Sequence, residues 1–219
     1  MTKEQIRARI AEIGIIPAVR LYSAKDALFA AETICESGIP IVEVTMTVPG
    51  ALGVISELAK HYAATLIVGA GTVFDVATAQ QCLDAGVGFL TTPGPDREIV
   101  EFAVKNGTVV FPGALTPGEI TAMWKAGADF VKIFPCAQLG GPSYIEALKA
   151  PFQHVPLIAS GGVNQENVTD FIRAGATALG IGRHLIHPDA IKNREDGWIR
   201  ELSHRYLSLV KQARKLKEK

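Results

Sequence analysis

The sequence places a lysine, Lys132, in the middle of an apolar run, FVKIF at positions 130–134. A short run of β-branched and aromatic residues is typical of a buried strand, and lysine is almost never fully buried without a partner. Burial and a nearby second cation both favour the neutral amine form of a lysine. A neutral amine attacks carbonyl carbons and forms a Schiff base. The pattern therefore predicts that Lys132 is a nucleophile rather than a surface charge.

Two more charged residues, Arg20 and Glu43, stand near the carboxyl ends of other apolar runs. Successive side chains of a strand point to opposite faces, and the apolar neighbours of Arg20 and Glu43 fill the face that must meet helices. We therefore expect Arg20, Glu43 and Lys132 to point into a common interior. A carboxylate beside a Schiff-base lysine can move the protons of the reaction. The alternative is a buried ion-pair network with a purely structural role.

Two glycine-rich turns follow the last two apolar runs of the repeating part of the chain. Ser160, Gly161 and Gly162 stand in ASGGV, and Gly182 precedes Arg183 in GIGRH. Bare backbone N–H groups in loops of this kind bind phosphate, and an arginine adds a charge-assisted hydrogen bond. These five residues are predicted to form a phosphate site. The alternative is that the glycines only make tight turns.

The elements that must position these residues are short apolar runs that alternate with helix-period segments. Strands that alternate with helices of 10 to 15 residues indicate parallel strands with helical crossovers, and eight such units fit a (β/α)₈ TIM barrel of the α/β class. A doubly wound sheet is disfavoured because GAGTVF lacks the third glycine of a dinucleotide-binding fingerprint. The predicted strands lie at 15–21, 39–46, 65–72, 88–94, 108–114, 130–135, 155–162 and 178–182.

The 219-residue length suits one core rather than two. Thr2 and Gln5 have the spacing of a capping box, and Gly14 stands where a helix would end. The predicted organisation is a single domain over 1–219, with an N-terminal helix at 1–14, the barrel at 15–186 and a C-terminal helical segment at 187–219.

Composition excludes several classes of function. The formal net charge is zero, which argues against a nucleic-acid partner. The chain contains no run of 18 apolar residues, so we expect no membrane span. Three cysteines without paired spacing suit a reducing cytoplasm. His184 and His187 have the spacing of metal ligands, but no third ligand accompanies them, so we expect no metal.

With these motifs in place, the chain resembles the 2-keto-3-deoxy-6-phosphogluconate (KDPG) and 4-hydroxy-2-oxoglutarate (KHG) aldolases. The resemblance runs from about residue 15 to 186. GIPIVEVT (38–45) is similar to the family's glutamate motif, and GADFVKIFP (127–135) is similar to its Schiff-base lysine motif. GAGT, TTPG, FPGALTPGE and ASGGV follow in the family's order and spacing.

The resemblance implies a role for each matching residue. Lys132 would form the imine and Glu43 would be the general acid and base. Thr72 and the loop before Gly94 would contact the carboxylate of pyruvate, while Pro93 and Phe134 shape the pocket. The phosphate site would fall on Ser160, Gly161, Gly162 and the turn at Gly182. The family also implies a homotrimer and no cofactor.

Two positions depart from the family pattern. Many members carry an arginine shortly after the glutamate, where this chain has Thr47. We expect both Thr47 and Arg20 to bind substrate, with Arg20 supplying the cation from the first strand. A serine common after the last strand's glycine is Arg183 here, which suits either a phosphate or a second carboxylate. The segment GPSYIEALK is similar to the phosphogalactonate branch as well.

The expected activity is reversible, metal-independent aldol cleavage of a keto-acid substrate. Cleavage of KDPG would yield pyruvate and D-glyceraldehyde 3-phosphate, and cleavage of KHG would yield pyruvate and glyoxylate. One alternative is the corresponding phosphogalactonate substrate. Others are a phosphosugar epimerase or isomerase on the same barrel, or a non-catalytic sensor that kept the phosphate cup.

Overall fold

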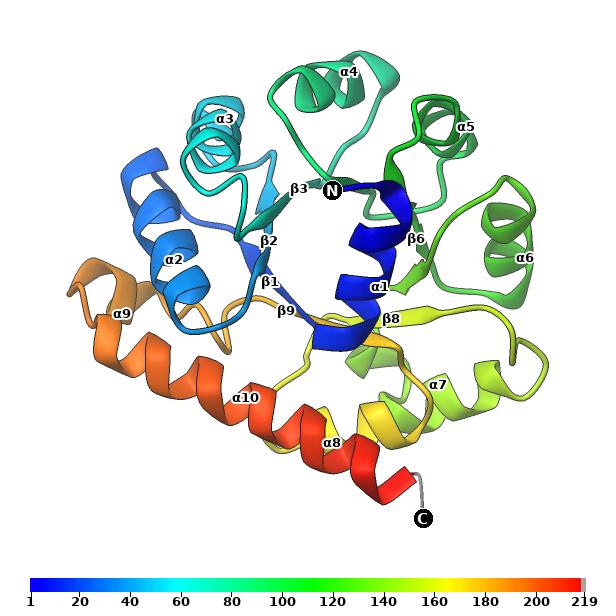
Figure 1. Cartoon of the computed structure of the whole chain (residues 1–219). Coiled ribbons are helices and arrows are strands. Elements are labelled where there is room, and N and C mark those ends of the chain that lie inside the picture. The colour runs from blue at the N-terminus through cyan, green and yellow to red at the C-terminus, as the bar shows by residue number, and fades with distance from the viewer. Residues whose placement is uncertain (218–219) are drawn as a thin grey trace.

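The computed structural model describes residues 1–217, and these form a barrel of parallel strands surrounded by helices (Figure 1). The strands are β1 (Ile15–Val19), β2 (Ile41–Thr45), β3 (Ile67–Gly71), β4 (Phe89–Thr91), β5 (Val109–Phe111), β6 (Gly113–Ala114), β7 (Val131–Ile133), β8 (Leu157–Ser160) and β9 (Ala178–Ile181). Neighbouring strands pair in the order β5-β4-β3-β2-β1-β9-β8-β7-β6. The predicted (β/α)₈ barrel is thereby confirmed.

Helices connect the strands and cover the outside of the barrel. They are α1 (Lys3–Ile13), α2 (Ala24–Glu36), α3 (Ala51–His61), α4 (Val76–Asp84), α5 (Arg97–Lys105), α6 (Pro117–Lys125), α7 (Pro142–Lys149), α8 (Val168–Arg173), α9 (Pro188–Lys192) and α10 (Asp196–Lys217), with a 3₁₀ turn at Ala137–Leu139. No helix within residues 1–217 is long and apolar enough to cross a membrane.

One predicted strand, 108–114, is two strands in the structure. Pro112 separates β5 from β6, because proline has no N–H to donate and is confined to breaks and edges of a sheet. The chain nevertheless continues around the barrel at this point: Gly113 donates from its N–H to the carbonyl of Thr92, at 3.1 Å, and also pairs with Lys132 in β7.

The interior of the barrel is filled from its amino end by large apolar side chains. Phe89, Phe111 and Phe130 stack inside, with ring centroids 4.8 Å apart for the first pair and 6.1 Å for the second. Gly69 leaves the space that this packing needs, since a Cβ there would lie 2.0 Å from the Phe89 ring. Phe130 therefore points into the interior of the barrel.

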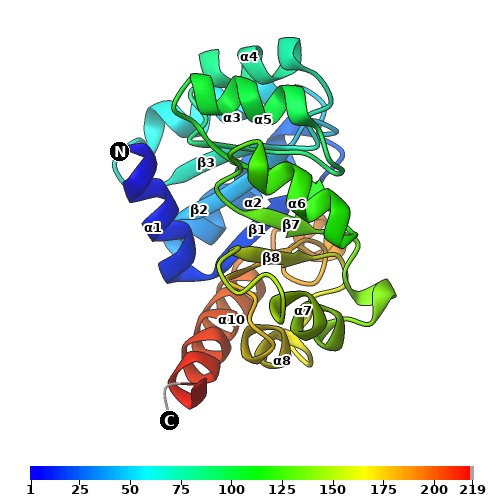
Figure 2. The ribbon, with the colours of Figure 1, turned by 90° about the vertical axis from the view of Figure 1, so that its right-hand side faces the viewer.

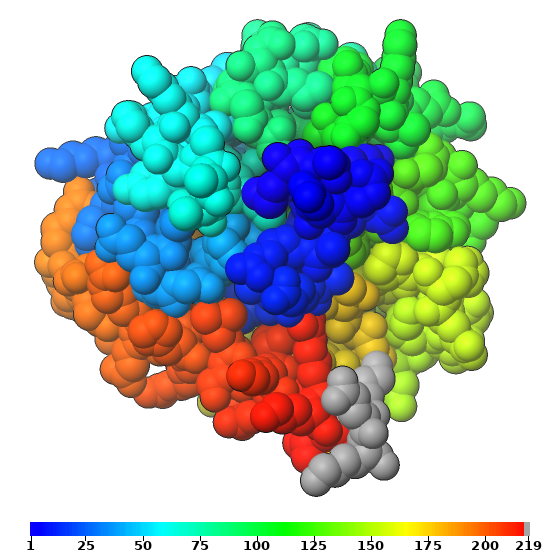
Figure 3. Space-filling view, in the orientation of Figure 1, coloured from blue at the N-terminus to red at the C-terminus, as the bar shows by residue number. Residues whose placement is uncertain are grey.

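Helix α1 closes the amino end of the barrel. It begins with the predicted capping box of Thr2 and Gln5 and ends at Gly14, whose φ of 72° suits glycine. Figure 3 shows the blue N-terminal residues covering the middle of this face, and Figure 2 shows α1 on one end of the barrel in side view. Its Ile6 and Ile10 pack onto the interior aromatic cluster.

A buried carboxylate ties α1 to the barrel. Asp129, which is 5% exposed, lies 3.0 Å from Lys3 Nζ and 3.3 Å from Arg7 Nε. It also accepts a hydrogen bond from the backbone N–H of Val110 at 2.9 Å. The charge of Asp129 is therefore fully partnered at the closed end.

The C-terminal helix α10 packs along the outside and reaches back to α1. Arg214 donates from Nη2 to the carbonyl oxygens of Ala11, at 2.7 Å, and Thr177, at 3.1 Å. A Cβ at Gly14 would lie 2.3 Å from the same guanidinium atom. Helix α10 thus contacts the carboxyl end of α1 beside the barrel's amino end. The last two residues of the predicted C-terminal segment, 218–219, lie outside the described residues.

Candidate active site

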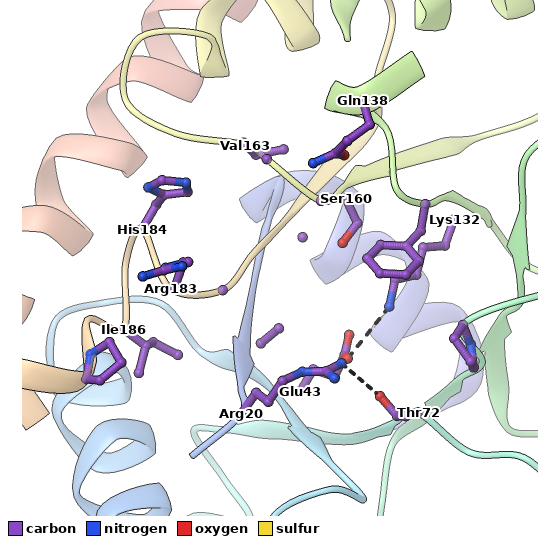
Figure 4. Close-up of a pocket in the computed structure, with 18 of the residues that line it drawn as sticks. Arg20, Glu43, Thr72, Lys132, Gln138, Ser160, Val163, Arg183, His184 and Ile186 are labelled. Carbon is purple, nitrogen blue, oxygen red and sulfur yellow. Dashed lines mark hydrogen bonds and ion pairs between the residues drawn. The ribbon is translucent and has the colours of Figure 1, made fainter. Parts of the chain in front are cut away.

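A cavity of about 590 Å³ opens at the carboxyl ends of the strands, the end opposite α1 (Figure 4). Arg20 reaches it from just beyond β1, Glu43 from β2 and Lys132 from β7. The convergence of these three charged residues, predicted from strand alternation, is what the structure shows. Nearly all the other predicted site residues line the same cavity: Thr72, Pro93, Phe134, Ser160, Gly161, Gly162, Gly182 and Arg183.

Lys132 and Glu43 form the centre of the cavity floor. They are 8% and 3% exposed, and Lys132 Nζ lies 3.7 Å from Glu43 Oε1. This separation is an ion pair rather than a hydrogen bond. Lys132 Nζ also lies 5.5 Å from the centroid of the Phe134 ring, within the range of a cation–π contact. The amine therefore has one loosely placed anionic partner and an open side toward the cavity.

Gly71 makes room for the glutamate, and the sequence reasoning did not single it out. A Cβ at Gly71 would lie 2.0 Å from Glu43 Oε1, so any larger residue would displace the carboxylate. Gly71 is the second glycine of the GAGT motif, which offered a signal that was not used. The absence of a side chain at Gly71 leaves the space that the Glu43 carboxylate occupies.

Arg20 and Thr72 are joined across the cavity mouth. Arg20 donates from Nη2 to Thr72 Oγ1 at 3.1 Å (Figure 4). Thr72 follows β3 with a φ of 62°, a left-handed conformation that is costly for a β-branched residue. Such conformations cost about 1–3 kcal/mol and cluster at binding and catalytic sites. The strained backbone holds the Thr72 hydroxyl and its donor Arg20 at the cavity.

The glycine-rich loops form the opposite wall of the cavity. Gly161 and Gly162 both have a positive φ, 86° and 85°. A Cβ at Gly162 would lie 2.3 Å from the Cβ of Ala137, and one at Gly180 would lie 2.6 Å from Ser160 Oγ. These glycines are therefore required by the local backbone and packing, and they leave this wall of the cavity without side chains.

Thr47 is the predicted site residue that the structure does not bring to the others. It is exposed, does not line the cavity, and shares a 2.8 Å hydrogen bond with the hydroxyl of Thr45. The Thr45 hydroxyl in turn donates to the carbonyl of Val19. Thr47 thus sits beyond the end of β2 as part of a turn, and the cation beside Thr72 comes from β1 instead.

Among the further residues that line the cavity and were not predicted as site residues, three have polar side chains: Tyr22, Gln138 and His184. Gln138 lies on the 3₁₀ turn after β7, and its amide points into the cavity in Figure 4. These residues stand on loops outside the periodic runs, where neither alternation nor glycine marks a position.

The buried cysteines are poor nucleophiles. Burial raises the pKa of Cys136 to about 12 and that of Cys82 to about 11, so their thiols stay protonated at neutral pH. Cys136 lies close after Lys132 in the sequence, but its thiol points to the carbonyl of Gly141. Within residues 1–217, no group of three or more His, Cys, Asp or Glu side chains is arranged to hold a metal ion.

A (β/α)₈ barrel with a buried lysine and glutamate side by side at the carboxyl ends of its strands is the arrangement of a Schiff-base, or class I, aldolase. Comparison with known proteins agrees. The KDPG and KHG aldolase family matches residues 6–202 of the chain.

Individual relatives extend this agreement. The chain is 30% identical to a 2-dehydro-3-deoxy-phosphogluconate aldolase of Pseudomonas aeruginosa, over 88% of this chain and 89% of the relative. It is 31% identical to a 2-dehydro-3-deoxy-6-phosphogalactonate aldolase of Escherichia coli, over 80% and 85%. Among solved structures, a KDPG aldolase from Legionella pneumophila, with pyruvate captured as a covalent carbinolamine, superposes with a TM-score of 0.83 at 28% identity, covering 90% and 95% of the two chains. The chain belongs to the KDPG and KHG aldolase family.

Proposed function

We propose that this chain cleaves KDPG to pyruvate and D-glyceraldehyde 3-phosphate, with Lys132 as the imine-forming nucleophile and Glu43 as the proton carrier. The observation that carries the proposal is the 3.7 Å separation of Lys132 Nζ and Glu43 Oε1 on the floor of a cavity. A single lysine and a single carboxylate suffice for Schiff-base aldol chemistry, whereas an epimerase needs a paired acid and base or a metal.

The reaction follows from the two side chains. Lys132 Nζ attacks the C2 carbonyl to give a carbinolamine, and loss of water gives a protonated imine. Removal of the proton from the C4 hydroxyl by Glu43 breaks the C3–C4 bond, and its electron pair enters the imine to form an enamine while the aldehyde leaves. Protonation at C3 and hydrolysis then release pyruvate and regenerate the amine.

The rest of the cavity fits the two ends of such a substrate. Arg20 and Thr72, already joined at 3.1 Å, offer a guanidinium and a hydroxyl to the carboxylate of the keto acid. Pro93 and Phe134 line the wall beside it. At the far side, Arg183 follows Gly182 and supplies a positive charge to a distal phosphate, together with Ser160, Gly161 and Gly162.

Phosphogalactonate and KHG substrates are the second candidates. A guanidinium at the cavity suits any of the three keto acids, and relatives with both phosphorylated substrates match this chain at similar identity. Comparison of kcat/KM for KDPG, its phosphogalactonate epimer and KHG assigns the preference. We expect both phosphorylated substrates to exceed KHG, because their phosphate lies two carbons beyond C4 and extends toward Arg183 and the glycine loops, whereas the second carboxylate of KHG is attached directly to C4.

Borohydride trapping tests the mechanism. Incubation with pyruvate and borohydride should add one reduced pyruvyl group, and peptide mass mapping should place it on Lys132. EDTA should leave cleavage unchanged. An adduct on another lysine, or isomerase activity without cleavage, would reject the proposal. Lys149 serves as a comparison site that should stay unmodified. Its Nζ donates hydrogen bonds to the backbone carbonyls of Phe152, Gln153 and Val155.

The chain's organisation is part of the same proposal. We infer one catalytic domain over 1–219, cytoplasmic and assembled as a homotrimer, on the strength of the family membership. Light scattering coupled to size exclusion gives the mass in solution, and a mass of one or two chains would contradict the trimer.

A further inference from the structure

A second, outer cavity of about 380 Å³ adjoins the catalytic cavity. Its walls are Gln165, Arg183, His184, His187 and Trp198, and two of these, Arg183 and His184, line the catalytic cavity as well. In Figure 4, Arg183 and His184 lie on the opposite side of the catalytic cavity from Lys132. The outer cavity therefore continues the path that leads from Lys132 past the distal end of the substrate site.

All five lining residues carry a nitrogen that can donate a hydrogen bond, and none of the five is acidic. The guanidinium of Arg183 has donors only, and so does the indole of Trp198. None of these groups carries a negative charge, and their N–H groups match the several acceptor oxygens of a phosphate or carboxylate.

Two of these donors are oriented by neighbours outside the cavity. Arg205 donates from Nη1 to Gln165 Oε1 at 3.0 Å, which occupies the amide oxygen and leaves the amide nitrogen to donate. The backbone N–H of Asp189 donates to His187 Nδ1 at 3.3 Å, so the other ring nitrogen, Nε2, carries the hydrogen. The Asp189 carboxylate, 3.6 Å from Nδ1, lies at this same inner edge of the ring.

Trp198 supports the His187 ring from the side. The two ring centroids are 6.1 Å apart at 71°, and Trp198 is 40% exposed. An edge-to-face contact of this kind restricts the imidazole to a narrow range of orientations. The donor groups of Gln165 and His187 are therefore oriented by neighbouring residues.

We propose that the outer cavity is a second oxyanion site, which takes a phosphate or carboxylate group beside the distal end of the aldolase substrate. This proposal rests on the proposed function only in taking the neighbouring cavity to be the aldolase active site. The anion belongs either to a substrate that reaches past Arg183 or to a free inorganic phosphate that binds alongside it.

Tryptophan fluorescence tests whether the site exists. The chain has two tryptophans, so Trp124→Phe leaves Trp198 as the only reporter. In this background, inorganic phosphate should change the fluorescence in a saturable way. Gln165→Leu and His187→Phe should each weaken phosphate affinity by about 10-fold or more, since each removes an oriented donor. The phenyl ring keeps the packing on Trp198.

His154→Phe is the matched control, because His154 makes the corresponding edge contact with residue 124, at 6.0 Å in the native chain, and lines neither cavity. It should leave phosphate affinity unchanged. No saturable response, or equal affinity in the Gln165, His187 and His154 variants, would overturn the proposal.

Kinetics then identify the source of the anion. If the anion is part of the substrate, Gln165→Leu and His187→Phe should lower kcat/KM for phosphorylated substrates and spare KHG. If it is free phosphate, both variants should keep native kcat/KM in phosphate-free buffer and lose the response to added phosphate. Pyruvate trapping at Lys132 should be unaffected in every variant, so a failure of the aldolase assignment is seen separately.

Discussion

The two ends of the barrel each bury a charged residue, and they treat it differently. At the amino end, Asp129 has Lys3 at 3.0 Å, Arg7 at 3.3 Å and the N–H of Val110 at 2.9 Å. At the carboxyl end, Lys132 has Glu43 at 3.7 Å and otherwise faces a cavity.

The contrast separates a structural charge from a reactive one. A buried charge whose atoms are all bonded loses little by leaving water and fixes the elements that partner it. A buried amine with one distant partner and an open side toward a cavity can reach a substrate carbon. Substitution at the amino end should therefore lower stability and spare activity, whereas substitution at the carboxyl end should lower activity.

The largest effect is expected from Lys132→Met, which keeps the volume and removes the nucleophile. The value of kcat should fall by at least about 10⁴-fold, because no other group can form the imine. The free energy of unfolding should fall by about 3 kcal/mol, because Glu43, which is 3% exposed, loses its cationic partner. Stopped assays and denaturant titration measure the two quantities, and residual pyruvate adduct would refute the role.

Glu43→Gln should come next, with kcat lowered by about 10²–10⁴-fold, the usual contribution of a general acid or base. The amide keeps the shape of the side chain, so substrate affinity should change much less than turnover. Gly71→Ala is a useful companion because its Cβ would displace Glu43 without altering any charge. A native rate in both variants would mean that protons travel by another route.

Arg183→Ala should reduce kcat/KM for the phosphorylated substrate by about 10- to 100-fold, the worth of a charged hydrogen bond. Trapping of pyruvate should hardly change, because pyruvate has no distal group. Equal losses in both assays would show that Arg183 supports the lysine site instead.

Asp129→Ala sharpens the comparison from the closed end. Loss of two ion pairs and one backbone hydrogen bond should lower the free energy of unfolding by about 2 kcal/mol. Activity at 25 °C should remain native because the residue faces away from the cavity. A kcat loss without a stability loss would reverse the assignment of the two ends.

The parts of the molecule that sequence predicted are those with a local cause. Alternation along a strand is set by the backbone pleat, so the inward directions of Glu43 and Lys132 could be read from their neighbours. The capping box of α1 depends on residues three apart.

The parts that escaped prediction depend on distant segments. Asp129 pairs with Lys3, which is distant in the sequence. Gly71 must lack a side chain because the Glu43 carboxylate, from another strand, occupies the space beside it. Thr47 was predicted as a site residue from the family pattern, but it lies in the turn after β2 and does not line the cavity. The break at Pro112 could have been predicted, since proline interrupts a strand. It was missed because the apolar residues on both sides form one continuous run.

The junction of α1 and α10 has a practical consequence for immobilisation. Arg214 fastens α10 to the carbonyl of Ala11 in α1, so the described part of α10 ends near the amino end of the barrel, where α1 also lies, away from the cavity mouth. A resin, reporter or carrier protein attached through either terminus would therefore lie at the amino end of the barrel, opposite the cavity. Ligands would still reach the cavity at the carboxyl ends of the strands.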